Sequence, residues 1–389
     1  MDCHANKFLR CPACGSGRHM RVLSILVATI ALGVLPCFSQ TNPDLQTYFR
    51  DYVGLTDDQI GFIRDGQAVT KVLPPRTPAE VFIFGAVHID SSPERYLDFA
   101  RDFDRLRALP GYLAIAPFSN PPRLSDLKDF AVESDEVEML KSCVPGKCLL
   151  QMPGSYIEDL QRTVDWSAPD VQEQLNRMLQ TSALNLLIAY QREGDQVLGE
   201  YNDKRSPTDV ARQFEYMLGY WRALPRYLPD FYNYLLAYPR RRPENVEETF
   251  YWARVNFGLK PTLRLVHVLT RKSERRGEPV YAIAEKQLYS SHYFETALDL
   301  TFCVRDRGEP KRPGFYLVKV MGSEQAGLTG LKGGIIRKAA VERSASSLQK
   351  SLTVIKDVLE HGQDNRRGPE CHARGQREKR ITTKEEFFE

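Results

Sequence analysis

The sequence predicts an α+β protein that combines antiparallel strands, a long C-terminal helix and a helical insertion. Apolar and polar residues alternate in successive runs between 247 and 321, which is typical of antiparallel strands with one packed face. An apolar stripe at helical spacing over about 334–361 predicts the long helix. Helical periodicity and many aromatic residues between 154 and 243 indicate the insertion.

The composition is that of a folded soluble protein. The chain has 389 residues, of which 42% are hydrophobic and 26% are charged. The formal net charge of +3 comes from an excess of basic residues in positions 1–39, so the rest of the chain is balanced. Such a balance disfavours nucleic acid and anionic membrane surfaces as partners.

The segment Met20–Ser39 has the layout of a secretory signal peptide. Arg21 supplies a positive start, residues 22–35 form an apolar run, and Cys37 and Ser39 are small residues before the expected cleavage point. We therefore expect export to the periplasm or the medium, with no membrane span in the mature chain. The apolar run is shorter than the roughly 20 residues of a spanning helix; an uncleaved anchor is the alternative.

The stretch ahead of Met20 contains Cys11-Pro-Ala-Cys14, which is similar to one half of a zinc ribbon. Cys3 and His4 could complete a set of four ligands. The alternative is that translation starts at Met20 and that the upstream stretch has no function. A signal peptide works at an amino terminus, which favours this second interpretation.

Two cysteines flank a Pro-Gly turn in the segment Cys143-Val-Pro-Gly-Lys-Cys148. Such a turn can bring the two Cα atoms within disulfide range, and an oxidising compartment would form the bond. We therefore predict a disulfide between Cys143 and Cys148. Two reduced thiols near a loop are the alternative.

Capping residues and turn residues mark where the elements before the insertion begin and end. Residues 40–79 form a lead-in, whose helix begins at a Thr56 cap and ends at Asp65-Gly66. Residues 80–153 form the first part of the α+β domain. In this part, β-branched and aromatic residues predict a strand over 80–90, and Ser92-Pro93-Glu94 is typical of a helix start.

After the insertion at 154–243, residues 244–361 supply the sheet and the terminal helix. In the first clear strand three leucines share a face with His267, namely Leu263, Leu265 and Leu269. We expect that packed face to continue through Lys286 in the next strand. In the last strand we expect it to include Phe315, Leu317, Lys319 and Met321. Glu295, Asp299 and Thr301 are expected to face water. The polar residues 362–389 predict a disordered charged tail.

Two stretches resemble the START-like (SRPBCC) superfamily, whose fold is the helix grip. VFIFGAVHIDSSPERYLDFARDFDRL is similar to the family's opening strand and first helix, and GGIIRKAAVERSASSLQKSLTVIKDVLE is similar to its closing helix. The resemblance covers residues 80–110 and about 247–361, and the helical insertion departs from it. It implies a curved antiparallel sheet that grips the C-terminal helix, with a cavity between them for lipids, sterols, polyketides or other apolar molecules.

Five residues are candidates for ligand binding: His267, Lys286, His292, Tyr293 and Arg337. If the packed face lines a cavity, His267 and Lys286 would orient a ligand there. The alternative is a satisfied buried histidine and a lysine that reaches the sheet edge. His292 and Tyr293 lie between two strands, where they could rim a pocket mouth or form a plain hairpin turn. Arg337 could meet an anionic head group or face solvent.

The sequence contains no nucleophile elbow, phosphate loop, dinucleotide fingerprint or HExxH motif, and its histidines lack metal-ligand spacing. We therefore expect no cofactor, no metal site and no catalytic residue. The leading hypothesis is a protein that binds an apolar or lipid-like molecule. The alternatives are a cyclase or hydrolase on the same scaffold that uses His267, and an envelope interaction protein whose cavity is filled by aromatic side chains from 217–232.

Overall fold

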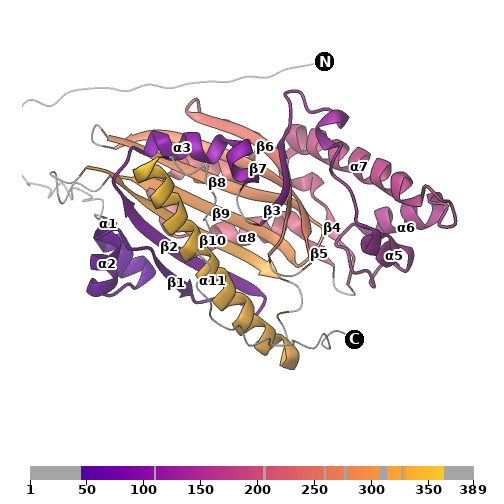
Figure 1. Cartoon of the computed structure of the whole chain (residues 1–389), viewed down its shortest axis with the longest axis horizontal. Helices are drawn as coiled ribbons and strands as arrows, with labels where there is room; N and C mark the ends of the chain where they lie inside the picture. Colours follow the sequence, from indigo (N-terminus) through magenta and orange to yellow (C-terminus); the bar gives the residue numbers. More distant parts are fainter. Residues whose placement is uncertain are drawn as a thin grey trace, which may run out of the picture. The chain divides into compact units, whose positions relative to one another are not determined.

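Eight antiparallel strands form the sheet around which the described part of the chain is built (Figure 1). The computed structural model describes residues 45–108, 111–204, 207–257, 260–275, 278–305, 313–325, 328 and 330–362. In sheet order the strands are β1 (Val69–Leu73), β2 (Glu80–Ile89), β10 (Phe315–Gln325), β9 (Phe294–Val304), β8 (Glu278–Ser290), β7 (Thr262–Arg275), β6 (Val246–Val255) and β3 (Tyr112–Pro117). A separate small sheet pairs β4 (Glu200–Tyr201) with β5 (Thr208–Asp209).

Helices lie on both faces of the large sheet. They are α1 (Leu45–Thr47), η1 (Tyr48–Val53), α2 (Asp57–Arg64), α3 (Pro93–Arg101), α4 (Phe103–Arg107), η2 (Leu124–Leu127), α5 (Ser134–Lys141), α6 (Gly154–Thr163), α7 (Val171–Glu193), η3 (Gly194–Val197), α8 (Val210–Tyr220), α9 (Ala223–Tyr227), α10 (Pro229–Ala237) and α11 (Gly330–His361). The α+β prediction is confirmed, because an antiparallel sheet contacts a long C-terminal helix and helical segments are inserted mid-chain.

Two helix starts predicted from the sequence are confirmed. The hydroxyl of Thr56 accepts from the backbone N–H of Gln59, whose side chain accepts from the Thr56 N–H, so α2 begins with a capping box. Ser92 caps α3 by accepting from the N–H of Arg95, and Pro93 occupies the first helical position. These local signals therefore fix where both helices begin.

Each face of the sheet has its own hydrophobic core. On one face, which we call the insertion face, Leu265, Leu300 and Val318 belong to a core shared with η1, α2 and α7–α10. On the other, which we call the terminal-helix face, Ile283 and Leu317 belong to a core shared with α3 and α11. Figure 1 shows α3 and α11 together on the near side of the strands.

The sequence placed four residues of the last strand on the face of His267, namely Phe315, Leu317, Lys319 and Met321. This prediction is wrong. Strand β10 pairs with β9 so that Lys319 lies opposite Thr301, and Val320 lies opposite Leu300. The four residues therefore lie on the terminal-helix face, and Val320 is on the face of His267.

Helix α11 packs closely against the sheet at Gly85 in β2. A Cβ atom on Gly85 would lie 2.7 Å from Cδ2 of Leu348 and 2.8 Å from Cδ1 of Leu352, so a larger residue there would push against the helix. Nearer the start of α11, the guanidinium of Arg337 donates to the carbonyl oxygens of Pro78 and Glu80, at 3.0 and 2.9 Å. Arg337 therefore ties α11 to the connection between β1 and β2.

Within the described residues, no helix combines the length and the apolar character that crossing a membrane requires. The predictions of a signal peptide, of an upstream zinc half-site and of a charged tail after Gly362 fall outside the described residues. They stay predictions.

We expect Gly85→Ala to lower the free energy of unfolding by about 1–3 kcal/mol, because the added methyl group overpacks the contact with α11. Gly219 in α8 is a matched control, since a Cβ atom there meets nothing within 4 Å. Gly219→Ala should leave stability unchanged or raise it by about 1 kcal/mol through helix propensity. Urea unfolding monitored by circular dichroism tests both variants. Equal effects would contradict the described contact of α11 with β2.

Candidate functional site

His267 is fully buried on the insertion face. Its Nδ1 atom is 3.1 Å from the hydroxyl of Tyr190 in α7, and its Nε2 atom is 3.3 Å from Oε2 of Glu248 in β6. The ring stacks on Phe250 with 4.2 Å between the centroids. Burial lowers the pKa of His267 to about 4, although Glu248 opposes the shift. The imidazole is therefore neutral at pH 7.

Lys286 lies directly opposite His267 on the neighbouring strand and is also buried. Its ammonium group forms an ion pair with Asp195 in η3 and lies 4.4 Å from the ring centroid of Phe214. Burial lowers the pKa of Lys286, and Asp195 opposes that shift. The start of η3 needs Gly194, because its φ is +76° and a Cβ atom there would lie 1.9 Å from the carbonyl oxygen of Tyr238.

The structure thus brings His267 and Lys286 together, but on the face opposite α11. Helices of the insertion cover both side chains, and each has partners inside the core. Buried polar groups with partners of this kind are common in protein cores. Nε2 of His267 faces Oε2 of Glu248 at 3.3 Å but forms no hydrogen bond of good geometry with it. The arrangement still fits two buried residues with partners inside the core better than two groups held ready for a ligand.

Helices α5 and α6 and the first half of α7 form a helical lobe with a hydrophobic cluster of its own. The cluster includes Leu140, Ile157 and Leu175. The sulfur atoms of Cys143 and Cys148, in the segment between α5 and α6, lie at disulfide distance, in agreement with the predicted pairing. The lobe is therefore a separately packed unit with a covalent link in its connecting loop.

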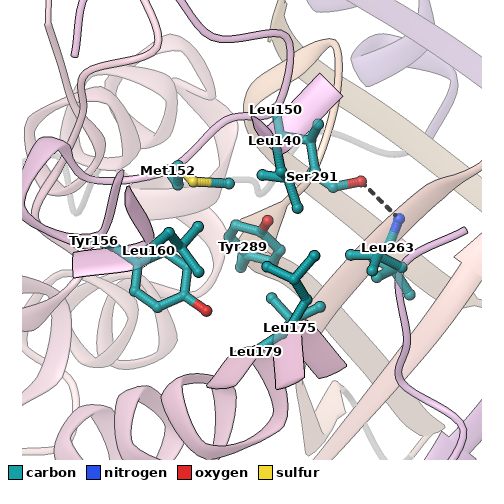
Figure 2. A pocket seen from close by; sticks show the side chains of 11 residues that line it. Leu140, Leu150, Met152, Tyr156, Leu160, Leu175, Leu179, Leu263, Tyr289 and Ser291 are labelled. Carbon is teal, nitrogen blue, oxygen red and sulfur yellow. Dashed lines mark hydrogen bonds between the residues drawn. The ribbon is translucent and has the colours of Figure 1, made fainter. Parts of the chain in front are cut away.

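A small cavity lies where the lobe meets the ends of β7 and β8 (Figure 2). Its volume is about 10 Å³, which is roughly the space of one water molecule. Six leucines and Met152 line it, with Tyr156, Tyr289 and Ser291 as the polar residues of the wall. The hydroxyl oxygen of Ser291 accepts a hydrogen bond from the backbone N–H of Leu263 at 3.0 Å. The interior is therefore almost entirely apolar.

The turn between β8 and β9 carries two residues that the sequence singled out, His292 and Tyr293, directly after Ser291. Ser291 lines the cavity. His292 is buried beside it, with Nδ1 3.1 Å from the carbonyl oxygen of Leu149 and Nε2 3.0 Å from Oε1 of Glu136 in α5. Tyr293 has a φ of +64°, which is uncommon for a bulky residue. The turn thus lies at the junction of lobe and sheet.

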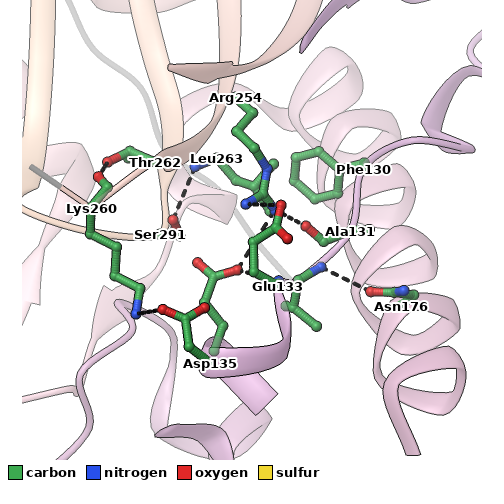
Figure 3. Close-up of polar contacts among 12 residues, drawn as sticks. Phe130, Ala131, Glu133, Asp135, Asn176, Arg254, Lys260, Thr262, Leu263 and Ser291 are labelled. Carbon is green, nitrogen blue, oxygen red and sulfur yellow. Dashed lines mark hydrogen bonds and ion pairs between the residues drawn. The ribbon is translucent and has the colours of Figure 1, made fainter. Parts of the chain in front are cut away.

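Cationic side chains from β6 and from the segment just before β7 hold the first turn of α5 (Figure 3). Arg254 in β6 lies 2.9 Å from Glu133 and 3.6 Å from Glu136. Lys260 pairs with Asp135 at 2.6 Å, and its hydrogen bond lowers the pKa of Asp135. The imidazole of His292 also contacts α5. We call this group of residues the polar latch: Arg254, Lys260, His292, Glu133, Asp135 and Glu136.

Sequence reasoning missed most of the polar latch, although two signals were present. Arg254 is a charged residue inside an apolar strand segment, and such residues are rarely buried without a partner. Glu133, Asp135 and Glu136 gather at the start of a helix, where carboxylates are favoured by the helix dipole. Neither signal identifies the partner, because the two segments are more than 100 residues apart.

No family model matches this chain, and no curated protein matches it in sequence. The likeness to the helix-grip fold therefore rests on an eight-stranded antiparallel sheet that packs against a long C-terminal helix.

We expect the free energy of unfolding to fall as the pH is lowered from about 6.5 towards 4. In that interval the unfolded chain binds a proton on its histidine, while the folded protein keeps His267 neutral because its pKa is about 4. The loss from this residue is at most about 3 kcal/mol. Urea titrations at pH 7 and pH 4.5 should show a smaller difference for His267→Gln than for the natural protein. The same pH dependence in both proteins would contradict the buried neutral imidazole.

We expect Arg254→Met to lower the free energy of unfolding by about 3–5 kcal/mol, because it leaves the buried carboxylate of Glu136 without its guanidinium. The double variant Arg254→Met/Glu136→Leu should recover part of this loss, since apolar residues then replace both charges. Arg177→Met is the control, because that arginine is exposed and its ion pairs contribute less than about 1 kcal/mol. A single and a double variant that are equally unstable would argue against a buried pair.

Proposed function

We propose that the protein binds an apolar or lipid-like small molecule between the helical lobe and the ends of β7 and β8. The observation that carries this proposal is the mostly apolar wall of the cavity, in which six leucines, Val132 and Met152 outnumber the hydroxyl-bearing residues Tyr156, Tyr289 and Ser291. Apolar internal spaces stay dry and take up apolar guests. Ligand sites commonly combine such walls with a few polar groups at the rim, which here are His292 and the rest of the polar latch.

A cavity of about 10 Å³ is too small for a lipid-like molecule, so binding needs the lobe to move away from the sheet. Two features support such a movement. The lobe has its own hydrophobic cluster, so its helices can stay packed on one another while they shift. Three methionines belong to or border that cluster, and methionine adapts readily to a changed surface: Met139, Met152 and Met178.

This location differs from the one expected from the resemblance, between the sheet and α11. Over β2 the helix packs directly on the strand at Gly85. Beyond the helix, the terminal-helix face carries charged groups such as Glu285 and Lys319. Both features make that side a poorer place for an apolar guest.

An enzyme that uses His267 is less well supported. Its imidazole is fully buried, and both ring nitrogens face partners in Tyr190 and Glu248. Substrate would have to displace α7 to reach it. The third hypothesis expects side chains from 217–232 to fill a cavity between the sheet and α11, whereas Met217 and Phe231 pack on the opposite, insertion face. It also names no partner.

We expect the natural protein to bind the neutral apolar dye N-phenyl-1-naphthylamine saturably, and Leu175→Phe to weaken that binding at least tenfold by filling the cavity. Leu187→Phe is the matched control, because it overpacks the same helix α7 but lies in the insertion-face core. Each substitution should cost about 1–3 kcal/mol of stability. Fluorescence titration gives the affinities, and circular dichroism verifies folding.

Organic extraction of the purified natural protein followed by mass spectrometry gives a second readout, in which we expect a bound lipid-like compound. The proposal fails if the natural protein binds no dye and yields no such compound. It also fails if both phenylalanine variants lose binding equally.

A further inference from the structure

The terminal-helix face carries a group of charged side chains on neighbouring strands, which we call the charged sheet patch: Arg264 on β7, Glu285 on β8, Asp299 on β9 and Lys319 on β10. None of these residues lines the apolar cavity or belongs to the polar latch. An inference from the patch is therefore independent of the proposed function.

Two carboxylates face each other inside the patch. Glu285 and Asp299 are directly opposite on adjacent antiparallel strands, an arrangement of like charges that destabilises a sheet. Glu285 has partners, because the ammonium group of Lys319 lies 3.9 Å from its Oε1 and the hydroxyl of Tyr251 donates to its Oε2 at 3.4 Å. Within the described residues, the carboxylate of Asp299 has no hydrogen bond and no ion pair.

Arg264 supplies an unused group of the opposite charge. Its Nε atom donates to Oε1 of Gln287 at 2.9 Å. In the described part of the chain, its two terminal guanidinium nitrogens have no hydrogen-bond partner. Arg264 lies on the same sheet face as Asp299, and its charge favours the ionised form of that carboxyl group. One sheet face thus presents an unpaired carboxylate and a guanidinium group with two unused nitrogens.

Solvent reaches this part of the sheet. The side chains of Glu285 and Lys319 are 29% and 17% exposed, although both lie on central strands. Figure 1 shows α3 and α11 on this face, with β9 and β10 visible between them. These exposed fractions are the observation that gives a small molecule access to the charged groups from solvent.

We propose that the charged sheet patch binds a small zwitterion of the free amino acid type, with its ammonium group held by Asp299 and Glu285 and its carboxylate held by Arg264. An ammonium group between the two carboxylates removes the repulsion across β8 and β9. The terminal nitrogens of a guanidinium match the two oxygens of a carboxylate. The like-charge pair costs stability in the free protein, and such a cost is typical of residues kept for binding.

The pH dependence of binding follows from Asp299. Burial raises the pKa of Asp299 to about 6; Glu285 adds to the increase, and Lys319 and Arg264 oppose it. Three tyrosines from other elements also lie within electrostatic range of the patch: Tyr96, Tyr112 and Tyr251. Since the ammonium group needs an ionised carboxylate, affinity should increase as the pH rises through about 6 and level off above it.

Isothermal titration calorimetry of the full chain with glycine, leucine, lysine and glutamate at pH 7.5 tests the proposal. We expect at least one of these zwitterions to bind. For leucine, two derivatives separate the contributions, because leucinamide lacks the carboxylate and N-acetylleucine lacks the ammonium group. Each derivative of a zwitterion that binds should bind at least tenfold more weakly than the parent compound.

Asp299→Asn and Arg264→Met should each weaken binding at least tenfold, whereas Arg177→Met, on the exposed side of α7, should not change it. Asp299→Asn should also raise the melting temperature at pH 7.5, because it removes the like-charge pair. Binding by no member of the panel, binding that survives both patch substitutions, or a lower melting temperature for Asp299→Asn would each overturn the proposal. Loss of dye binding in the cavity variants would not affect it.

Discussion

The rest of the structure depends on a sheet that buries both of its faces. Alternate residues of each strand serve two separate cores, so most side chains of the central strands are buried on either face. Any buried polar residue in such a strand needs a hydrogen-bond or ion-pair partner from the elements that cover that face. His267 and Lys286 have theirs in the insertion, through Tyr190 and Asp195. The helical insertion thus supplies both apolar cover and the polar partners that make these residues tolerable.

The same constraint explains how much of the fold could be predicted. Helix starts depend on local chemistry, and the caps at Thr56 and Ser92 lie where the sequence indicated. Strand existence follows from composition. Strand facing in β10 was not predictable, because Leu317 and Val318 are both apolar and both buried. When a strand is covered on each side, the alternation of apolar and polar residues no longer distinguishes its two faces. Only the pairing with β9 then determines which residues of β10 face which core.

The candidate site was predictable in part and for a similar reason. Neighbouring strands place His267 opposite Lys286, and the sequence grouped these two residues from their alternation alone. Their partners come from distant segments, which no local pattern identifies. The same holds for Arg254, whose carboxylate partners lie on α5. Charged residues inside apolar strands were thus the useful signal. They indicated that a buried polar partner exists, but they did not identify the partner residue.

The independent cluster of the helical lobe has a consequence for how the molecule samples partly unfolded forms. Its buried leucines belong to a cluster distinct from the two sheet cores, and charges at α5 tie the lobe to the sheet. Such a unit can behave as a foldon that opens at a lower free energy than the strands. Amide hydrogens of α5 and α6 would then exchange with solvent before those of β7–β9. The cross-link between Cys143 and Cys148 would keep the connecting loop compact in that excited state.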